Sequence, residues 1–199
     1  MFRFFCTLMK VSFKEGTLLY PLPVVMVSCG SIEDEMNIVT VAWTGTINTD
    51  PPMCYISLRK SRHSHGIISR CGEFAINLVT EPLAKAADWC GVKSGRDCNK
   101  FETMRLTPIK GQKIKAPLIA ESPLSLECKV VEMKELGSHD MFIAEVVAVD
   151  VEESLIDKTT GQFQLNHARP VAYSHGKYYN LGEKIGSFGF SVKKNKRKK

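Results

Sequence analysis

Short runs of apolar and β-branched residues dominate the chain, either unbroken or alternating with polar residues. This pattern is typical of β-strands, and the Gly, Pro, Asp and Ser residues that bound the runs favour turns. Two long runs flank a turn at Gly137-Ser138-His139-Asp140, which predicts a hairpin. The predicted strands cover residues 23–30, 36–43, 53–58, 74–79, 124–133, 141–151, 170–173 and 177–181.

Helical patterns are few, over residues 61–71, 81–89 and 99–104. Gly72 is well placed to end the first of them, and Pro82 suits the first turn of the second. Many strands with a few short flanking helices predict a mainly β fold, an antiparallel sheet closed into a barrel. The chain has no GxGxxG or GxxxxGK[ST] motif and no regular strand–helix alternation, which excludes a doubly wound nucleotide-binding fold.

The composition is that of a globular protein. Of 199 residues, 44% are hydrophobic and 24% charged, so neither a disordered nor a collagenous chain fits, and the length favours one domain. No apolar run approaches the ~18 residues that a membrane helix needs, so we expect no membrane span.

The excess positive charge lies in the last seven residues. The chain has 27 Lys and Arg against 21 Asp and Glu, and residues 193–199 supply the six extra cations. Such a tail is typically disordered and solvated, although contact with an acidic surface is an alternative. The neutral remainder, without a basic and aromatic strand face, argues against a nucleic-acid binder.

The first residues, MFRFFCTLMK, are apolar but lack the cleavage site of a signal peptide. We interpret residues 1–13 as a strand or arm packed on the domain, residues 14–192 as the domain and residues 193–199 as the tail. A natural start at Met9 is the alternative.

The seven cysteines are odd in number and form no CxxC motif. Several lie in apolar runs, so we expect reduced, mostly buried thiols in a cytoplasmic protein. For Cys90 and Cys98 in a loop-like stretch, a redox pair or a metal site remains the alternative to free thiols.

Residues 43–48 suggest the first half of a ligand site. Strand ends flank what we predict to be a polar turn, Thr44 to Asn48, which would expose backbone N–H groups and hydroxyls together. A flat heteroaromatic ligand needs such groups, although a plain connection between strands has the same residue types.

Residues 57–65 suggest the second half. Arg59, Arg62 and the interleaved serines leave a strand and enter a helix. Hydroxyls and guanidinium groups at a helix N-terminus form an anion site, which implies a phosphate, although a solvated basic helix start is the alternative. A zinc site from His63 and His65 does not fit, because i, i+2 spacing places the two on different helix faces.

At this point the sequence resembles a known family. The phrases AWTGTINTDPP, ISLRKSRHSHGII, GEFAINL, GSHDMFIAEVVAV and YYNLGEKIGSFGF, in this order, are similar to the flavin reductase-like family of FMN-binding split barrels and to its flavoredoxin-like branch. The resemblance covers residues 14–192. It implies a six-stranded Greek-key split barrel that forms a homodimer, with FMN near the interface.

The resemblance also implies roles for single residues. The edge of the flavin ring would be lined by Thr44, Gly45 and Thr46, with Asn48 nearby and Trp43 behind the turn. Ser57 and Arg59 would reach its pyrimidine side or ribityl chain. The phosphate would be surrounded by Arg62, Ser64 and His65. Relatives often carry Thr where this chain has Ser64, and the hydroxyl is kept.

Three further features are less specific. His139 would contact a phosphate or orient a nicotinamide, or be a surface turn residue, and hydride transfer to flavin requires no acid or base from it. Phe101, beside Lys100, would pack near the flavin or in the core. The aromatic pair Tyr178-Tyr179 would stack on flavin or pack at a subunit interface.

The leading hypothesis is therefore an oxidoreductase in which NADH or NADPH reduces bound FMN. Free flavin, ferric iron or a partner protein would then take the electrons. The alternative is a non-enzymatic electron carrier of the flavoredoxin type, reduced by a partner protein.

Overall fold

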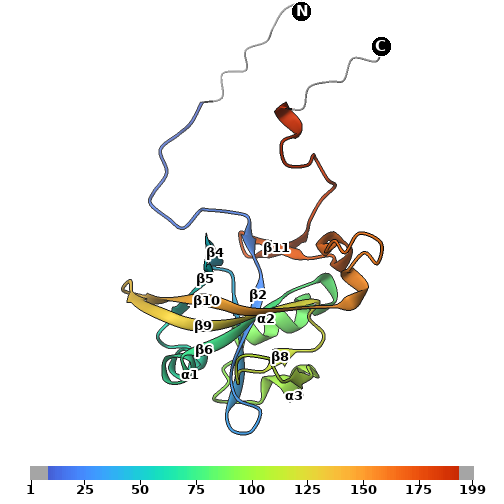
Figure 1. The fold of residues 1–199 in the computed structure, drawn as a ribbon. Coiled ribbons are helices and arrows are strands. Elements are labelled where there is room, and N and C mark those ends of the chain that lie inside the picture. Colours follow the sequence, from blue (N-terminus) through green and yellow to red (C-terminus); the bar gives the residue numbers. More distant parts are fainter. Residues whose placement is uncertain (1–8, 193–199) are drawn as a thin grey trace, which may run out of the picture.

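The computed structural model describes residues 9–192, which are built around one strongly curved antiparallel sheet (Figure 1). Across this sheet the strands follow the order β3-β2-β6-β9-β10-β5-β4. The strands are β2 Val25–Gly30, β3 Met36–Val41, β4 Thr44–Thr49, β5 Pro52–Arg59, β6 Glu73–Leu78, β9 Leu124–Glu135 and β10 His139–Val151.

The connection between β3 and β4 shows that the sheet closes into a barrel. These strands lie at opposite edges of the strand order, yet only Ala42 and Trp43 separate them. Because a residue spans at most about 3.6 Å, the two edges must meet. The Ser57 amide of β5 donates to the Trp43 carbonyl at 2.8 Å, which extends the pairing of β5 with β4 up to this connection. The predicted mainly β barrel is confirmed, with seven strands in the main sheet rather than six.

The additional strand is β4, where the prediction of a turn from Thr44 to Asn48 was wrong. Thr44, Thr46, Ile47 and Thr49 are β-branched and favour extended backbone, and β4 pairs with β5 from Thr44 to Thr49 with a bulge at Ile47. Polar residues are tolerated because β4 is an edge strand with one exposed side. The reversal comes instead at Asp50-Pro51.

The predicted hairpin is confirmed as β9 and β10, with Gly137 in the left-handed region at φ 92°. The turn is shorter than predicted, because β10 already begins at His139. His139 and Asp140 are therefore strand residues, opposite Arg59 and Leu58 of β5. This pairing places His139 at the same end of the barrel as the start of the first helix.

The predicted helices form with small changes at their ends. The first, α1, ends where predicted, since Gly72 caps it in the left-handed conformation and donates to Ile68. The second begins as a 3-10 turn with Pro82 in it, and Asn99 caps the third by accepting from two amides. The helical elements are α1 His63–Cys71, η1 Glu81–Leu83, α2 Ala84–Val92, α3 Lys100–Met104, η2 Glu153–Leu155, η3 Leu165–Ala168 and η4 Phe190–Val192.

Two apolar clusters hold these elements together. One fills the barrel and the contact with α1, around Ile56, Phe74 and Phe142. The other lies between the barrel and the helices α2 and α3, where Met26 and Phe101 are fully buried. Phe101 is thus a core residue, one of the two roles expected for it.

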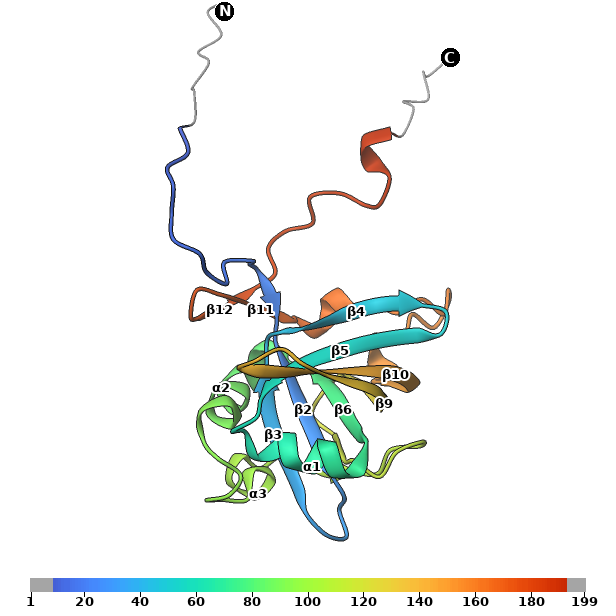
Figure 2. The same ribbon diagram turned by 90° about the vertical axis from the view of Figure 1, so that its left-hand side faces the viewer.

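Two small sheets complete the fold, β1 Leu22–Pro23 with β11 Val171–Ser174 and β12 Lys177–Asn180, and β7 Pro108–Ile109 with β8 Leu118–Ile119. The described terminal segments leave the body on one side, beside β11 and β12 (Figures 1 and 2). Residues 9–13 form no strand and are exposed, so this part of the expected packed arm does not contact the domain. Residues 1–8 and the tail 193–199 lie outside the described residues.

The cysteines within the described range are free thiols, as expected, and Cys29, Cys54, Cys90 and Cys128 are buried. Burial raises the pKa of the Cys29 thiol to about 12 and that of Cys90 to about 11. Both are therefore protonated at neutral pH. Across residues 9–192, no helix is long and apolar enough to cross a membrane.

Candidate functional site

Strand β5 and helix α1 position the candidate site at one end of the barrel. Arg59 ends β5, a short turn follows, and Arg62 takes the N-cap position of α1. Two hollows open here, and both are lined by Arg59 and Arg62. A ligand that occupied both would pass these two guanidinium groups.

The first, which we call the cationic hollow, has a volume of about 490 Å³ and surrounds the start of α1. Ser64 lies on its floor, fully buried, and its Oγ accepts a hydrogen bond of 2.9 Å from Nδ2 of Asn37 in β3. The amide thus fixes the hydroxyl oxygen, and the hydroxyl also forms a hydrogen bond with the buried Cys29 thiol. The lining residues are Asn37, Val39, Arg59, Ser61, Arg62, His63, Ser64, Lys93, Ser94, Gly95, Arg96 and Lys100.

Lys100 is the buried cation of this hollow. Its ammonium donates to the carbonyl oxygens of Ile38 and Cys90, both at 2.7 Å. Burial lowers the pKa of Lys100, and the nearby charge of Arg62 acts in the same direction. The two carbonyls use two of the three ammonium hydrogens, which leaves one for an anion.

The second, which we call the aromatic hollow, has a volume of about 330 Å³. The rings of Trp43 and His139 both line it and pack against each other, with centroids 4.6 Å apart. Tyr173 of β11 and the hydroxyl-bearing Ser57 line it as well. A flat ring fits such walls better than a flexible chain does.

His139 is uncharged at neutral pH in this setting. Burial lowers its pKa below the ordinary value of 6.5, and the charge of Arg59, directly across the sheet, lowers it further against the opposing effect of Asp140. The Nδ1 atom lies 2.9 Å from the Ser138 hydroxyl. A neutral ring with one nitrogen held in this way can present its other nitrogen to a ligand.

The structure brings together six of the eleven predicted site residues. Trp43, Ser57, Arg59, Arg62 and His139 line the aromatic hollow, and Ser64 joins the two arginines in the cationic hollow.

The four predicted residues of β4 lie beside these hollows rather than in them. Thr44 is buried, and its hydroxyl donates to the Tyr55 carbonyl at 2.6 Å. The Asn48 amide donates to the Pro51 carbonyl at the far end of the strand. Gly45 and Thr46 lie between them on the edge that follows Trp43. Their contact with a flavin ring stays a prediction.

His65 points away from both hollows. Its Nε2 lies 2.8 Å from Oδ2 of Asp140, a carboxylate that is 1% exposed, and its ring packs edge-on against Phe142. Lys60 approaches the other oxygen of Asp140 at 3.5 Å. The side chain of His65 thus ties α1 to β10.

Sequence reasoning missed two parts of the lining of the cationic hollow, Asn37 and the loop after α2. Asn37 looked like an ordinary strand residue, and residues 91–95 like a loop. The loop in fact carries Lys93 and Arg96 over the start of α1. The sequence offered one signal, two cations within a Gly- and Ser-containing loop, but nothing local indicated where that loop would lie.

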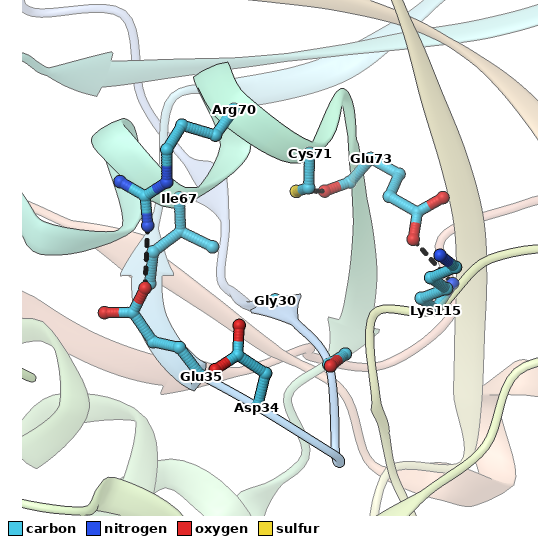
Figure 3. Close-up of a pocket in the computed structure, with 9 residues that line it drawn as sticks. Gly30, Asp34, Glu35, Ile67, Arg70, Cys71, Glu73 and Lys115 are labelled. Carbon is cyan, nitrogen blue, oxygen red and sulfur yellow. Dashed lines mark hydrogen bonds and ion pairs between the residues drawn. The ribbon is translucent and has the colours of Figure 1, made fainter.

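A third hollow, of about 400 Å³, lies at the other end of α1 (Figure 3). Its charges are mixed and paired: Arg70 contacts Glu35 at 2.7 Å, and the Lys115 amide donates to Glu73. Cys71 is exposed at its side. Because acidic groups line it, this hollow suits an anion less well than the cationic hollow does.

Comparisons with known proteins agree with this geometry. Residues 17–182 match the family described as "Flavin reductase like domain". The flavoredoxin of Desulfovibrio vulgaris (Miyazaki F) superposes with a TM-score of 0.85 at 32% identity, over 93% of this chain and 100% of that one. An uncharacterised protein of Archaeoglobus fulgidus is 31% identical over 161 residues, 81% of this chain and 88% of its own. An NADH-dependent FMN reductase of Streptomyces nodosus subsp. asukaensis is 26% identical over 145 residues, 73% and 77% of the two chains.

Proposed function

We propose a function for this chain, which belongs to the flavin reductase-like domain family. It binds FMN and passes electrons from NADH or NADPH to a second acceptor. One observation carries the proposal: a ring-sized aromatic hollow and a cationic hollow meet at Arg59 and Arg62. FMN has the same two parts, a flat ring and a phosphate joined by a short chain.

The donor groups at the start of α1 suit a phosphate. The Ser64 hydroxyl is fixed by Asn37 at the start of the helix, and Lys100 has one free hydrogen. Arg62 adds a guanidinium group at the helix N-terminus, where the helix dipole also favours an anion. We therefore place the phosphate of FMN on Ser64, Arg62 and Lys100.

The aromatic hollow would hold the ring end. Trp43 and Ser57 would border the ring, with Arg59 between the ring and the phosphate. Thr44, Gly45, Thr46 and Asn48 would meet the ring from the free edge of β4. His65 would support α1 through Asp140 rather than touch the phosphate. Bound FMN would supply the chemistry of hydride acceptance and onward electron transfer.

His139 would align the nicotinamide. Its neutral ring stands against Trp43 at the mouth of the aromatic hollow. Since hydride transfer needs no protein acid or base, the contribution of His139 would be orientation and exclusion of water.

The visible spectrum of the purified protein tests the proposal. We expect a bound flavin band that anaerobic NADH or NADPH bleaches, and the effective nucleotide would identify the donor. A colourless protein that also fails to bind added FMN would overturn the assignment. Titration of the reduced protein with free flavin, ferric iron and candidate proteins would then identify the acceptor.

An electron carrier is the second candidate, because the flavoredoxin of D. vulgaris matches the whole fold at 32% identity. In that case FMN would stay bound and a partner protein would reduce it. The same spectra decide between the two: a flavin band that neither nucleotide bleaches, but that dithionite does, favours the carrier.

We also propose a homodimer in a cytoplasmic setting. Apolar side chains are exposed along both terminal segments, which leave the body on the same side (Figure 2). Burying such side chains against a second copy would contribute about 25 cal/mol per Å². Light scattering should give twice the chain mass, and the mass of one chain would contradict the dimer. The exposed residues are Met9, Val11, Phe13, Leu18, Leu19, Leu181, Ile185, Phe188, Phe190 and Val192.

A further inference from the structure

The cationic hollow carries more positive charge than one phosphate needs. Five cationic side chains line it, from β5, α1, α3 and the loop after α2. Within residues 9–192, no Asp or Glu belongs to its lining. His63 also lines the hollow, but it is already paired: its Nε2 lies 2.9 Å from Glu35, a carboxylate that also binds Arg70. The five are Arg59, Arg62, Lys93, Arg96 and Lys100.

Two of the five are held in place by the loop after α2. A Cβ on residue 95 would lie 2.2 Å from Oδ1 of Asn37, so only glycine allows the loop to pass this close to β3. Arg96 donates through Nη1 to the Ser61 carbonyl at 3.2 Å, and its amide donates to the Ser94 hydroxyl. These contacts fix the loop against the turn before α1.

The volume of the cationic hollow also exceeds what one phosphate group needs. A phosphate monoester carries at most two negative charges, and Ser64, Arg62 and Lys100 already provide a hydroxyl and two cations for it. A volume of about 490 Å³ equals that of some sixteen liquid waters at about 30 Å³ each, well beyond one phosphoryl group. Lys93 and Arg96 are exposed and form the rim, whereas Ser64 and Lys100 of the first phosphate site are buried.

We propose that Lys93 and Arg96 form a second phosphoryl subsite, which receives the pyrophosphate of a dinucleotide. This inference rests on the proposed function. Two cofactors of such a protein carry a pyrophosphate: FAD, bound in place of FMN, and the nicotinamide dinucleotide that donates the hydride. The surplus cations would favour either of them over ligands with a single phosphate.

The test removes both rim charges without touching the groups assigned to the first phosphate. The variant is Lys93→Gln with Arg96→Gln, and the matched control is Lys113→Gln with Lys129→Gln, two exposed lysines outside the hollow. Affinities for FMN and FAD are measured by flavin fluorescence, and KM for NADH and NADPH by flavin bleaching. Calorimetry on flavin-free protein compares inorganic pyrophosphate with phosphate.

We expect the variant to bind FMN within threefold of the parent protein and to lose tenfold or more toward one dinucleotide, a loss worth about 1.4 kcal/mol. A loss confined to FAD identifies the flavin as the source of the pyrophosphate, and a rise confined to the KM of the nicotinamide identifies the donor. Pyrophosphate should bind the parent protein, but not the variant, at least tenfold more tightly than phosphate does.

Equal losses for FMN and FAD would overturn the proposal, because the loop would then belong to a single-phosphate site. Dinucleotide binding that does not change, or that changes equally in the control, would also overturn it. If the parent protein binds no flavin at all, the proposed function fails, while the pyrophosphate titration still decides the subsite separately.

Discussion

Loss of Ser64 and Arg59 together should nearly abolish FMN binding. Ser64 is the buried hydroxyl on the floor of the cationic hollow, and Arg59 lies where the two hollows meet. A hydrogen bond to a charged group contributes about 1.5–3 kcal/mol. Because Arg59 is exposed, we take the lower end of this range for it. The double variant Ser64→Ala, Arg59→Ala should therefore lose about 3–4.5 kcal/mol, a rise in Kd of roughly 10²- to 10³-fold.

The Ser64→Ala substitution should also lower the stability of the flavin-free protein. Asn37 donates to the Ser64 oxygen inside the core, and Ala at position 64 would leave that amide hydrogen without its partner. An unsatisfied buried donor costs about 1–3 kcal/mol. Ser64→Ala alone should thus lower Tm, whereas Arg59→Ala should not, since its guanidinium is exposed.

Flavin fluorescence quenching gives the Kd values, and thermal unfolding of the flavin-free variants gives the stabilities. Ser69→Ala with Lys129→Ala is the matched control, which removes one hydroxyl and one positive charge at exposed positions. An unchanged Kd in the double variant would refute the placement of the phosphate. A lowered Tm with an unchanged Kd would leave Ser64 only a structural role.

Four further outcomes follow from the same contacts. His139→Ala should slow flavin reduction by NADH or NADPH at least tenfold and raise the Kd of FMN far less, because the ring borders the hollow without supplying a charge or a required hydrogen bond; a loss of FMN binding as large as the loss of rate would make His139 chiefly a flavin-binding residue. Since the pKa of His139 is lowered, the rate should stay constant as pH falls to 6.5 and decline only below it, and a decline centred above 6.5 in a pH series would contradict a neutral ring. Glu127→Ala should cost at least about 3 kcal/mol of unfolding free energy in a urea titration, because its buried carboxylate accepts from the amides of residues 112–114, and Glu127→Gln should cost less. Deletion of residues 193–199 should leave the flavin content of the purified protein unchanged, and loss of flavin would make the tail part of the site.

Local sequence patterns were sufficient for most of the barrel. Unbroken apolar runs became the central strands β2 and β6, which are covered on both faces. Gly72 ended α1 where its freedom at positive φ predicted. The pattern failed at β4, because an edge strand with an exposed side can be as polar as a turn.

The arginines of the site were predictable for a similar local reason. Arg59, Arg62 and Ser64 lie within six residues, so a strand end followed by a helix start brings them together in almost any fold. The contacts of His65 were not predictable in this way. Its partner Asp140 is 75 positions away, and only the pairing of β10 with β5 brings the two together.

The loop that carries Lys93 and Arg96 shows most clearly how fold and site depend on each other. Asn37 is a buried polar residue in the largely apolar strand β3, which packing alone does not explain. Its Nδ2 donates to Ser64 Oγ, and its side chain lies so close to Gly95 that a Cβ at position 95 would clash with it. The same side chain therefore contacts both the start of α1 and the loop. An apolar residue of similar size would keep β3 buried but would lose the hydrogen bond to Ser64, so the need for a polar side chain at position 37 comes from the site rather than from the barrel.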